Sequence, residues 1–279
     1  MLEKVMRHEW RETYKVNGIL LIIITAVTLL GVIMLQAPIF FEGHGRERVT
    51  MLDVMSVMSL IFYFLTVAAV FCGSVIYLGI NFYRSMYTDR GYLTHTLPVS
   101  AHELFGGKLL VACIWHLIFR VAVFGSIVIL GLSGLSFLGG VFGDYGLALD
   151  IWRGIMEEFF RAYTVEEAFM LAGSLLIPVI TAAVRLFVLY GAITIGQLFN
   201  KYKVLMSILS FVGINMGLKF LAGLFTVPFL VGEMLEETLL TQPISVSVGS
   251  VVELLVYVAA AAALYVFSIH IIQRRLNLE

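Results

Sequence analysis

The feature that most restricts the fold of this chain is a set of six long runs of apolar residues that contain almost no charge. A helix rises about 1.5 Å per residue and needs about 20 apolar residues to cross the core of a bilayer. The sequence is 60% hydrophobic and 13% charged, whereas soluble domains average about 25% charged residues. We therefore predict an all-α polytopic membrane protein with six transmembrane helices. The predicted spans are 18–36, 58–80, 109–132, 172–198, 204–224 and 248–271.

Lysine and arginine are unevenly distributed between the segments that connect these spans. Eleven lie in the amino-terminal segment, in the connections after the second and fourth spans and in the carboxy-terminal segment, whereas the other connections contain four. Cytoplasmic flanks of membrane proteins are enriched in these residues, so we predict that both termini are cytoplasmic. The net charge of −1 provides no basic field for nucleic acid, and no nucleic-acid partner is expected.

The residues before the first apolar run form an amphipathic segment, which predicts an amino-terminal interfacial helix over 1–16. A plain positively charged anchor is the alternative interpretation. The segment does not have the pattern of a secretory signal, because mostly polar residues precede the apolar run and no small-x-small site follows it. The apolar positions that recur at helical spacing are Leu2, Val5, Met6, Trp10 and Tyr14.

Two connections on the predicted outer side are too long to be simple turns. The segment 133–171 contains an acidic amphipathic stretch at 151–163. The connection between the fifth and sixth spans has Pro228 and Pro243 on either side of a short acidic helix candidate, and it is apolar enough to re-enter the membrane. No internal repeat or polar linker divides the chain, so we predict a single membrane domain over 1–279.

A compact polar segment at 88–108 separates the second and third apolar runs. Arg90 and Gly91 form a turn signal, and Pro98 disfavours a helix in the residues before it. We expect this segment to be a rigid cytoplasmic projection on short tethers. The alternative is a simple solvated loop between two helices.

The second half of this polar segment has the pattern of a helix start. Ser100 and Glu103 have the S-x-x-E spacing of a capping box, which predicts a short helix that begins at Ala101. Gly106 and Gly107 follow, and they predict a flexible joint before the third span.

The sequence NFYRSMYTDRGYLTHTLPVSAHELFGGKLL, residues 81–110, resembles the loop after the second span in bacterial ABC transporter permeases of the type-2 exporter class. The pattern F-Y-x-x-M-x-x-D-x-G-Y-L-T-x-T-L-P-V-S recurs there. The carboxy-terminal RRLNLE is also similar to the usual ending of this group. The resemblance covers the whole plan of spans but is specific only in this loop and at the tail. The matching residues are Phe82, Tyr83, Met86, Asp89, Gly91, Tyr92, Leu93, Thr94, Thr96, Leu97, Pro98, Val99 and Ser100.

In that family two permease subunits form the membrane path, and two separate ATPase subunits bind and hydrolyse ATP. The resemblance implies that this chain is a permease subunit in the cytoplasmic membrane of a bacterial cell, working as a homodimer or heterodimer on an amphiphilic peptide, drug or lipid. It implies no catalytic residue and no cofactor on this chain, with ATP and magnesium on the partner. The phosphate-loop pattern G-x-x-x-x-G-K-[ST] does not occur in the sequence. The implied ATPase-coupling helix comprises Leu97, Pro98, Val99, Ser100, Ala101, His102, Glu103 and Leu104.

Four charged residues lie inside the predicted spans. Arg120 and Arg185 are near the middle of the third and fourth spans, where an arginine costs at least about 2.5–3.5 kcal/mol and must face protein or water. With His116 one turn before Arg120, they are candidates for a substrate path; bonding to helix carbonyls or a nearby hydroxyl is the structural alternative. Lys219 and Glu253 are expected to form an intramembrane ion pair that acts as a brace rather than in transport.

A secondary transporter or channel without an ATPase is the main alternative function. It predicts acidic residues at the membrane centre or broken helices in repeated halves, and Glu253 lies off centre. An enzyme is disfavoured, because EEFFR at 157–161 is one residue shorter than the E-E-x-x-x-R pattern of intramembrane prenyl-protein proteases and no span carries a matching pair of histidines. Cys72 and Cys113 lie in apolar runs and are expected to pack as small buried hydrophobes, not as a disulfide or metal pair.

Overall fold

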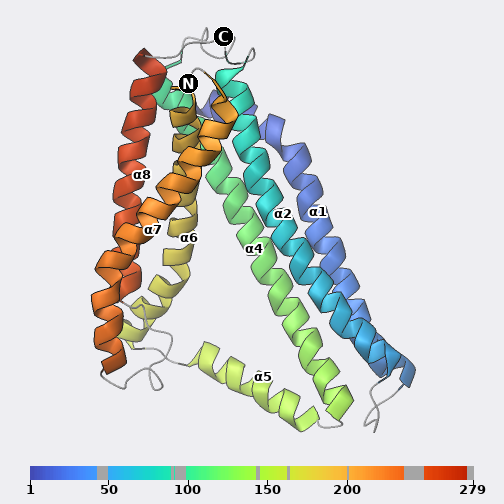
Figure 1. Cartoon of the computed structure of the whole chain (residues 1–279). Helices are drawn as coiled ribbons and strands as arrows, with labels where there is room; N and C mark the ends of the chain where they lie inside the picture. Colours follow the sequence, from blue (N-terminus) through green and yellow to red (C-terminus); the bar gives the residue numbers. More distant parts are fainter. Residues whose placement is uncertain are drawn as a thin grey trace. The chain divides into compact units, whose positions relative to one another are not determined.

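The structure is a computed structural model, which describes residues 1–42, 50–88, 91, 99–142, 145–161, 164–199, 201–235 and 248–274. Within these residues all regular secondary structure is α-helical. Figure 1 shows the helices α1 (Leu2–Glu42), α2 (Met51–Tyr87), α4 (Ala101–Phe142), α5 (Tyr145–Phe160), α6 (Val165–Gly196), α7 (Lys203–Leu235) and α8 (Val248–Arg274).

Six of these helices are long and apolar enough to cross a membrane, and α5 is not among them. Each of the six overlaps one of the predicted spans: α1, α2, α4, α6, α7 and α8. The prediction of an all-α protein with six spans is therefore confirmed at this level.

The predicted interfacial segment at 1–16 is not a separate helix. It forms the first turns of α1, which continues without a break through 41 residues. Glu9, Thr13 and Asn17 are buried on one side of this helix, so its polar residues meet protein partners as well as solvent.

The connections on the predicted outer side also differ from expectation. Residues 151–160 of the predicted amphipathic stretch belong to α5, which begins earlier, at Tyr145, and ends at Phe160. The expected helix boundary at Pro228 is wrong, because α7 continues past this proline to Leu235. The rest of that connection, including Pro243, lies outside the described residues.

The chain divides into two compact units. The first comprises Met1–Thr13, Tyr77–His116 and Tyr163–Glu279, and the second comprises Tyr14–Ile76 and Leu117–Ala162. The helices α1, α2 and α4 contribute residues to both units. The single membrane domain stays a prediction.

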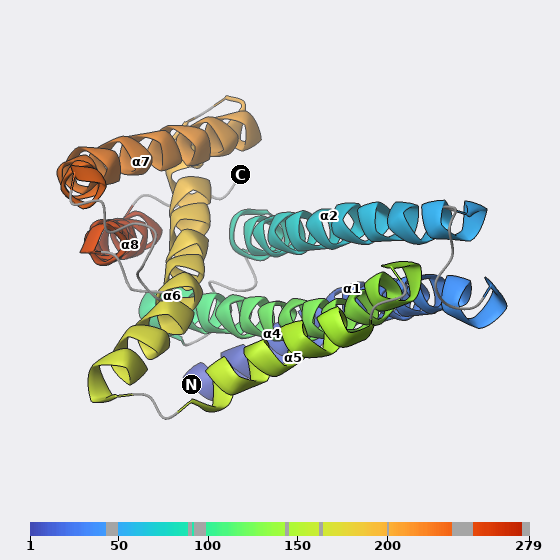
Figure 2. The ribbon, with the colours of Figure 1, turned by 90° about the horizontal axis from the view of Figure 1, so that it is seen from below.

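In the second unit, parts of α1, α2 and α4 run side by side (Figure 2). The hydroxyl of Ser56 on α2 donates a hydrogen bond to the main-chain oxygen of Met34 on α1 at 2.6 Å. The hydroxyl of Tyr63 on α2 shares a hydrogen bond with Ser126 on α4. These bonds join the three helices inside a small apolar core. Its buried residues are Leu35, Tyr63, Leu130 and Phe137.

In the first unit, α6, α7 and α8 pack against one another (Figure 1). The turn from α6 to α7 depends on Gly196. A Cβ atom on this glycine would lie 2.6 Å from the main-chain nitrogen of Ser207 and 2.7 Å from its Cα. Only a residue without a side chain allows this approach. The buried residues shared by the three helices are Val184, Val188, Leu218, Tyr257 and Ala261.

Replacing Gly196 with alanine is expected to destabilise the protein by about 1–3 kcal/mol, because the new methyl group overlaps main-chain atoms that cannot rotate away. The melting temperature of the detergent-solubilised protein measures this change. Gly213→Ala on α7 is the matched control, since nothing lies within 4 Å of its Cβ position and alanine is the better helix former. Equal melting temperatures for the two variants would contradict the packing of α6 on α7.

Candidate functional site

The candidate functional site is the beginning of α4, residues 99–108, together with the side chains of α1, α2, α6 and α8 that hold it. We refer to residues 99–108 as the α4 start. All of these residues belong to the first compact unit. The α4 start includes six of the eight residues predicted to form a coupling helix, whereas Leu97 and Pro98 lie outside the described residues.

The α4 start opens with a capping box. The main-chain N–H of Ser100 donates to Oε2 of Glu103 at 3.3 Å, and the Ser100 hydroxyl donates to the same oxygen at 3.2 Å. In return, the N–H of Glu103 donates to Oγ of Ser100 at 3.3 Å. The helix begins at Ala101. The predicted capping box and the predicted first helical residue are both confirmed.

The residues of the α4 start differ in how far they are exposed. Ser100 and His102 are exposed, Val99, Ala101 and Glu103 are half-buried, and Leu104 is buried. Nδ1 of His102 and the hydroxyl of Tyr265 on α8 are hydrogen-bonded at 3.2 Å. The α4 start therefore keeps a polar outer face while its other side packs on the protein.

The predicted flexible joint at Gly106 and Gly107 is wrong, because α4 runs through both residues without a break to Phe142. The second glycine instead permits a close helix crossing. A Cβ atom on Gly107 would lie 2.9 Å from Cγ1 of Val5 and 3.5 Å from Cδ1 of Leu2, both on α1. The glycine is needed for packing and leaves the α4 start continuous with the third span.

A buried ion pair connects α1 to the α4 start. Nζ of Lys108 donates to Oε2 of Glu9, and both side chains are only 4% exposed. Nδ2 of Asn81 on α2 donates to the other carboxylate oxygen of Glu9 at 2.7 Å. Each oxygen of Glu9 is thus bonded to a different helix, and one carboxylate joins α1, α2 and α4.

Two tryptophans extend the contact between α1 and α4. The indole rings of Trp10 and Trp115 are stacked, with centroids 4.5 Å apart. Nε1 of Trp115 donates to Oγ1 of Thr13 at 3.0 Å, and Thr13 donates to the main-chain oxygen of Glu9 at 2.9 Å. The polar groups in this contact are therefore satisfied inside the protein, as buried polar groups require.

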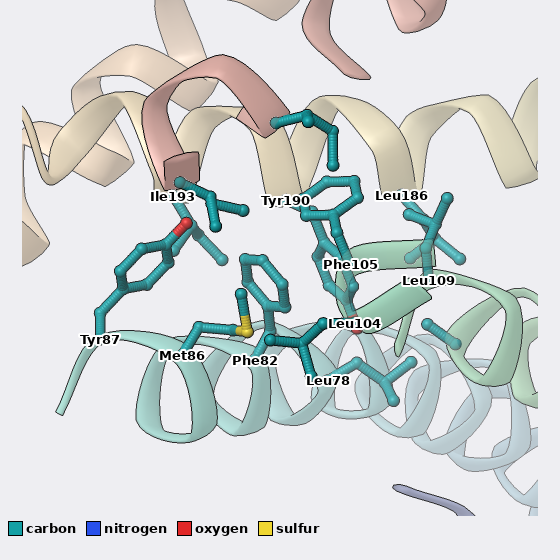
Figure 3. Close-up of a cluster of buried hydrophobic side chains, with 13 residues drawn as sticks. Leu78, Phe82, Met86, Tyr87, Leu104, Phe105, Leu109, Leu186, Tyr190 and Ile193 are labelled. Atoms are coloured by element: carbon teal, nitrogen blue, oxygen red, sulfur yellow. The ribbon is translucent and has the colours of Figure 1, made fainter. Parts of the chain in front are cut away.

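Aromatic side chains pack the α4 start against α2 and α6 (Figure 3). The ring of Phe82 on α2 is stacked on Tyr190 of α6 with centroids 4.0 Å apart. Phe105 of α4 meets Phe82 edge-on at 5.6 Å. The hydroxyl of Tyr87 at the end of α2 shares a hydrogen bond with Thr194 of α6 at 2.8 Å. The apolar core and this hydrogen bond fix the end of α2 beside the α4 start.

Of the predicted turn at Arg90 and Gly91, the structure describes only Gly91. The N–H of Gly91 donates to the main-chain oxygen of Thr88 at 2.6 Å. A Cβ atom on Gly91 would lie 2.7 Å from the carbonyl carbon of Met86, so this close approach requires glycine at position 91.

The predicted substrate-path residues are distributed over two helices. On α4, His116 is buried and Arg120 is half-buried, and on α6 Arg185 is exposed. Both Arg185 and Glu253 of α8 lie close enough to Tyr257 to act on it electrostatically. The role of these residues in a path stays a prediction.

The predicted brace between Lys219 and Glu253 is not seen. Lys219 is exposed on α7 and Glu253 is half-buried on α8, and no ion pair joins them in the part of the chain that the structure describes.

Among the described residues, no group of three or more His, Cys, Asp and Glu side chains could hold a metal ion. Both cysteines are free, and Cys72 is exposed on α2, contrary to the expectation that it is buried.

The sequence interpretation missed Glu9, Asn81 and Lys108. Lys108 entered only as one of the cytoplasmic positive charges, and neither Glu9 nor Asn81 was given a role. A signal was present, because Glu9 and Thr13 follow Val5 at intervals of one helical turn and so lie on the apolar stripe of α1. A carboxylate on an apolar stripe predicts a buried partner of opposite charge.

Comparison of the chain with family models, with curated proteins and with solved structures gives no match. The fold itself places the chain in a class: it is a multi-pass α-helical membrane protein with six candidate spans.

Replacing Lys108 with methionine is expected to destabilise the protein by about 3–5 kcal/mol, because Glu9 would stay buried without its positive partner. Adding Glu9→Gln is expected to recover a large part of this loss, because an amide needs no counter-charge. Unfolding of the single and double variants in detergent measures the coupling between the two residues.

The control for this pair is Arg7→Met, which breaks the exposed ion pair with Glu3 at 3.2 Å and is expected to cost less than about 1 kcal/mol. A loss for Lys108→Met as small as that for Arg7→Met would show that the buried pair does not form.

Replacing Ser100 with alanine is expected to destabilise the first turn of α4 by about 0.5–2 kcal/mol, because the N–H of Glu103 loses its acceptor. Hydrogen exchange of the full-length protein should become faster in this turn. Ser100→Thr keeps a hydroxyl and should exchange at nearly the original rate. Equal acceleration in both variants would argue against the cap.

Proposed function

We propose that the chain is the membrane-spanning permease subunit of an ATP-driven exporter in the bacterial cytoplasmic membrane. In this proposal both termini are cytoplasmic, and residues 97–104 form a coupling helix on which a separate ATPase subunit docks. The sequence at 82–100, which resembles the coupling loop of type-2 exporter permeases, supports the proposal. The capped and partly exposed α4 start, located where that resemblance predicts the docking helix, supports it further.

The main observation in support of the proposal is that side-chain contacts hold the α4 start against α1, α2 and α8. The ion pair of Lys108 with Glu9 joins it to α1, and the bond from Asn81 extends this connection to α2. The hydrogen bond of His102 with Tyr265 joins it to α8. A push on a helix start held in this way moves the attached helices together, whereas a flexible joint would absorb the motion.

The chain's own part in this mechanism is to receive and pass on movement. ATP binding and hydrolysis, with magnesium, belong to the partner ATPase. Ser100 and His102 offer exposed polar side chains for docking, and the buried network behind them transfers the displacement to α1, α2 and α4. The first turns of α1 would lie at the cytoplasmic surface beside this docking site.

The displacement would open and close a path between this chain and a second permease subunit, in a homodimer or heterodimer. The cargo class is an amphiphilic peptide, drug or lipid, in keeping with the apolar helices. His116, Arg120 and Arg185 are the candidates to hold an anionic group of such a cargo or of a lipid.

Affinity-tagged full-length protein, purified in mild detergent from its native membranes, is expected to carry a partner with a phosphate-loop ATPase sequence, identified by mass spectrometry. Leu97→Asp and His102→Asp are each expected to reduce the recovered ATPase at least about tenfold, corresponding to a loss of about 1.4 kcal/mol in binding. Arg153→Ala on α5 is a matched control, because it removes an exposed charge outside the docking segment, and should leave recovery unchanged.

Full recovery of the ATPase with both docking variants would show that residues 97–104 are not the docking helix. Ion-driven flux through vesicles that contain the purified chain alone would favour a secondary transporter instead.

A further inference from the structure

The helix α5 lies in the chain between two helices that can each cross the membrane (Figure 2). Residues 143–144 connect it to α4, and residues 161–164 connect it to α6. It has 16 residues and is therefore about 24 Å long, too short to cross the bilayer core of about 30 Å. Its short connections keep both of its ends near the membrane surface at which α4 and α6 emerge.

The side chains of α5 are sorted onto two faces. At about 3.6 residues per turn, the charged residues Asp150, Arg153 and Glu157 share one half of the helix. Nη1 of Arg153 pairs with Oδ1 of Asp150 at 3.8 Å on this polar face. The opposite half is the apolar face, and its described residues are Leu149, Ile151, Trp152, Ile155 and Met156.

Much of the apolar face is not covered by the second compact unit, to which α5 belongs. Leu149, Ile151 and Ile155 are 53%, 42% and 50% exposed, respectively. Complete burial of one such side chain is worth about 1.5–3 kcal/mol. A face with several of them is stable only against an apolar partner.

We propose that α5 lies in the plane of the membrane surface and binds the lipid bilayer through its apolar face. Three observations indicate that the bilayer is the partner of this apolar face. They are the short connections to two helices that can span the membrane, a length too small for a span, and the confinement of charge to one face. A helix of this kind buries its apolar face at the boundary between headgroups and acyl chains. The proposal does not depend on the chain being an exporter.

The charges of the polar face indicate which lipids α5 binds. Asp150 and Glu157 outnumber Arg153 on this face, so anionic headgroups are disfavoured relative to neutral ones. The binding energy therefore comes from the apolar face, and phosphatidylglycerol is not required.

The test uses the full-length protein with Cys72→Ala and Cys113→Ala, reconstituted in phosphatidylcholine vesicles with or without phosphatidylglycerol. Single cysteines replace Leu149, Ile151 and Ile155 on the apolar face, and Asp150, Arg153 and Glu157 on the polar face. Each cysteine carries a nitroxide spin label. Power saturation then gives its accessibility to oxygen, which dissolves in the bilayer, and to a water-soluble nickel chelate.

Labels on the apolar face are expected to have several-fold higher oxygen accessibility relative to nickel than labels on the polar face, in both kinds of vesicle. High nickel accessibility on both faces would overturn the proposal, because α5 would then be surrounded by water. Low accessibility to both reagents on the apolar face would also overturn it, because a second copy of the chain or another protein would then cover that face. Since exposed sites on both faces are sampled, loss of one variant to misfolding leaves the comparison intact.

Discussion

The arrangement of the first unit depends on the buried ion pair between Glu9 and Lys108. Removing a carboxylate and an ammonium group from water costs several kcal/mol per ion, which is offset only when the two groups meet with good geometry and their remaining bonding capacity is satisfied. Both side chains are 4% exposed, and Asn81 satisfies the second oxygen of Glu9. Because the three residues come from α1, α4 and α2, the electrostatic requirement of one buried carboxylate fixes the relative placement of three helices in this unit.

The contacts around this ion pair hold the beginning of α4 rigidly against its neighbouring helices. Gly107 lets α1 approach α4 closely, the stacked ring of Trp10 lies on Trp115, and Phe105 packs into the aromatic core. Interiors packed in this way transmit displacement because their side chains have little free volume. A displacement of the capped beginning of α4 would therefore be passed on to the helices that pack against it. A coupling element needs this property.

The sequence predicted those features that depend on local patterns. The spans follow from runs of apolar residues, and the start of α4 follows from the spacing of Ser100 and Glu103. The ion pair could not be predicted in the same way, because it joins positions 9 and 108, and their proximity depends on how three helices pack. Gly107 was misread as a joint because glycine serves both flexible turns and close helix crossings. No ion pair joins Glu253 to Lys219 among the described residues, and neighbouring spans in the sequence do not by themselves fix which helix faces meet.

The central claim, that α1 is held directly against the beginning of α4, is tested most directly by a disulfide between positions 5 and 107. A Cβ atom at Gly107 would lie 3.3 Å from Cβ of Val5, close to the separation of about 3.5–4.5 Å found in disulfides. In a variant with Cys72→Ala and Cys113→Ala, the pair Val5→Cys and Gly107→Cys is predicted to cross-link almost completely under mild oxidation in intact membranes. Both thiols remaining free and reactive under these conditions would contradict the account.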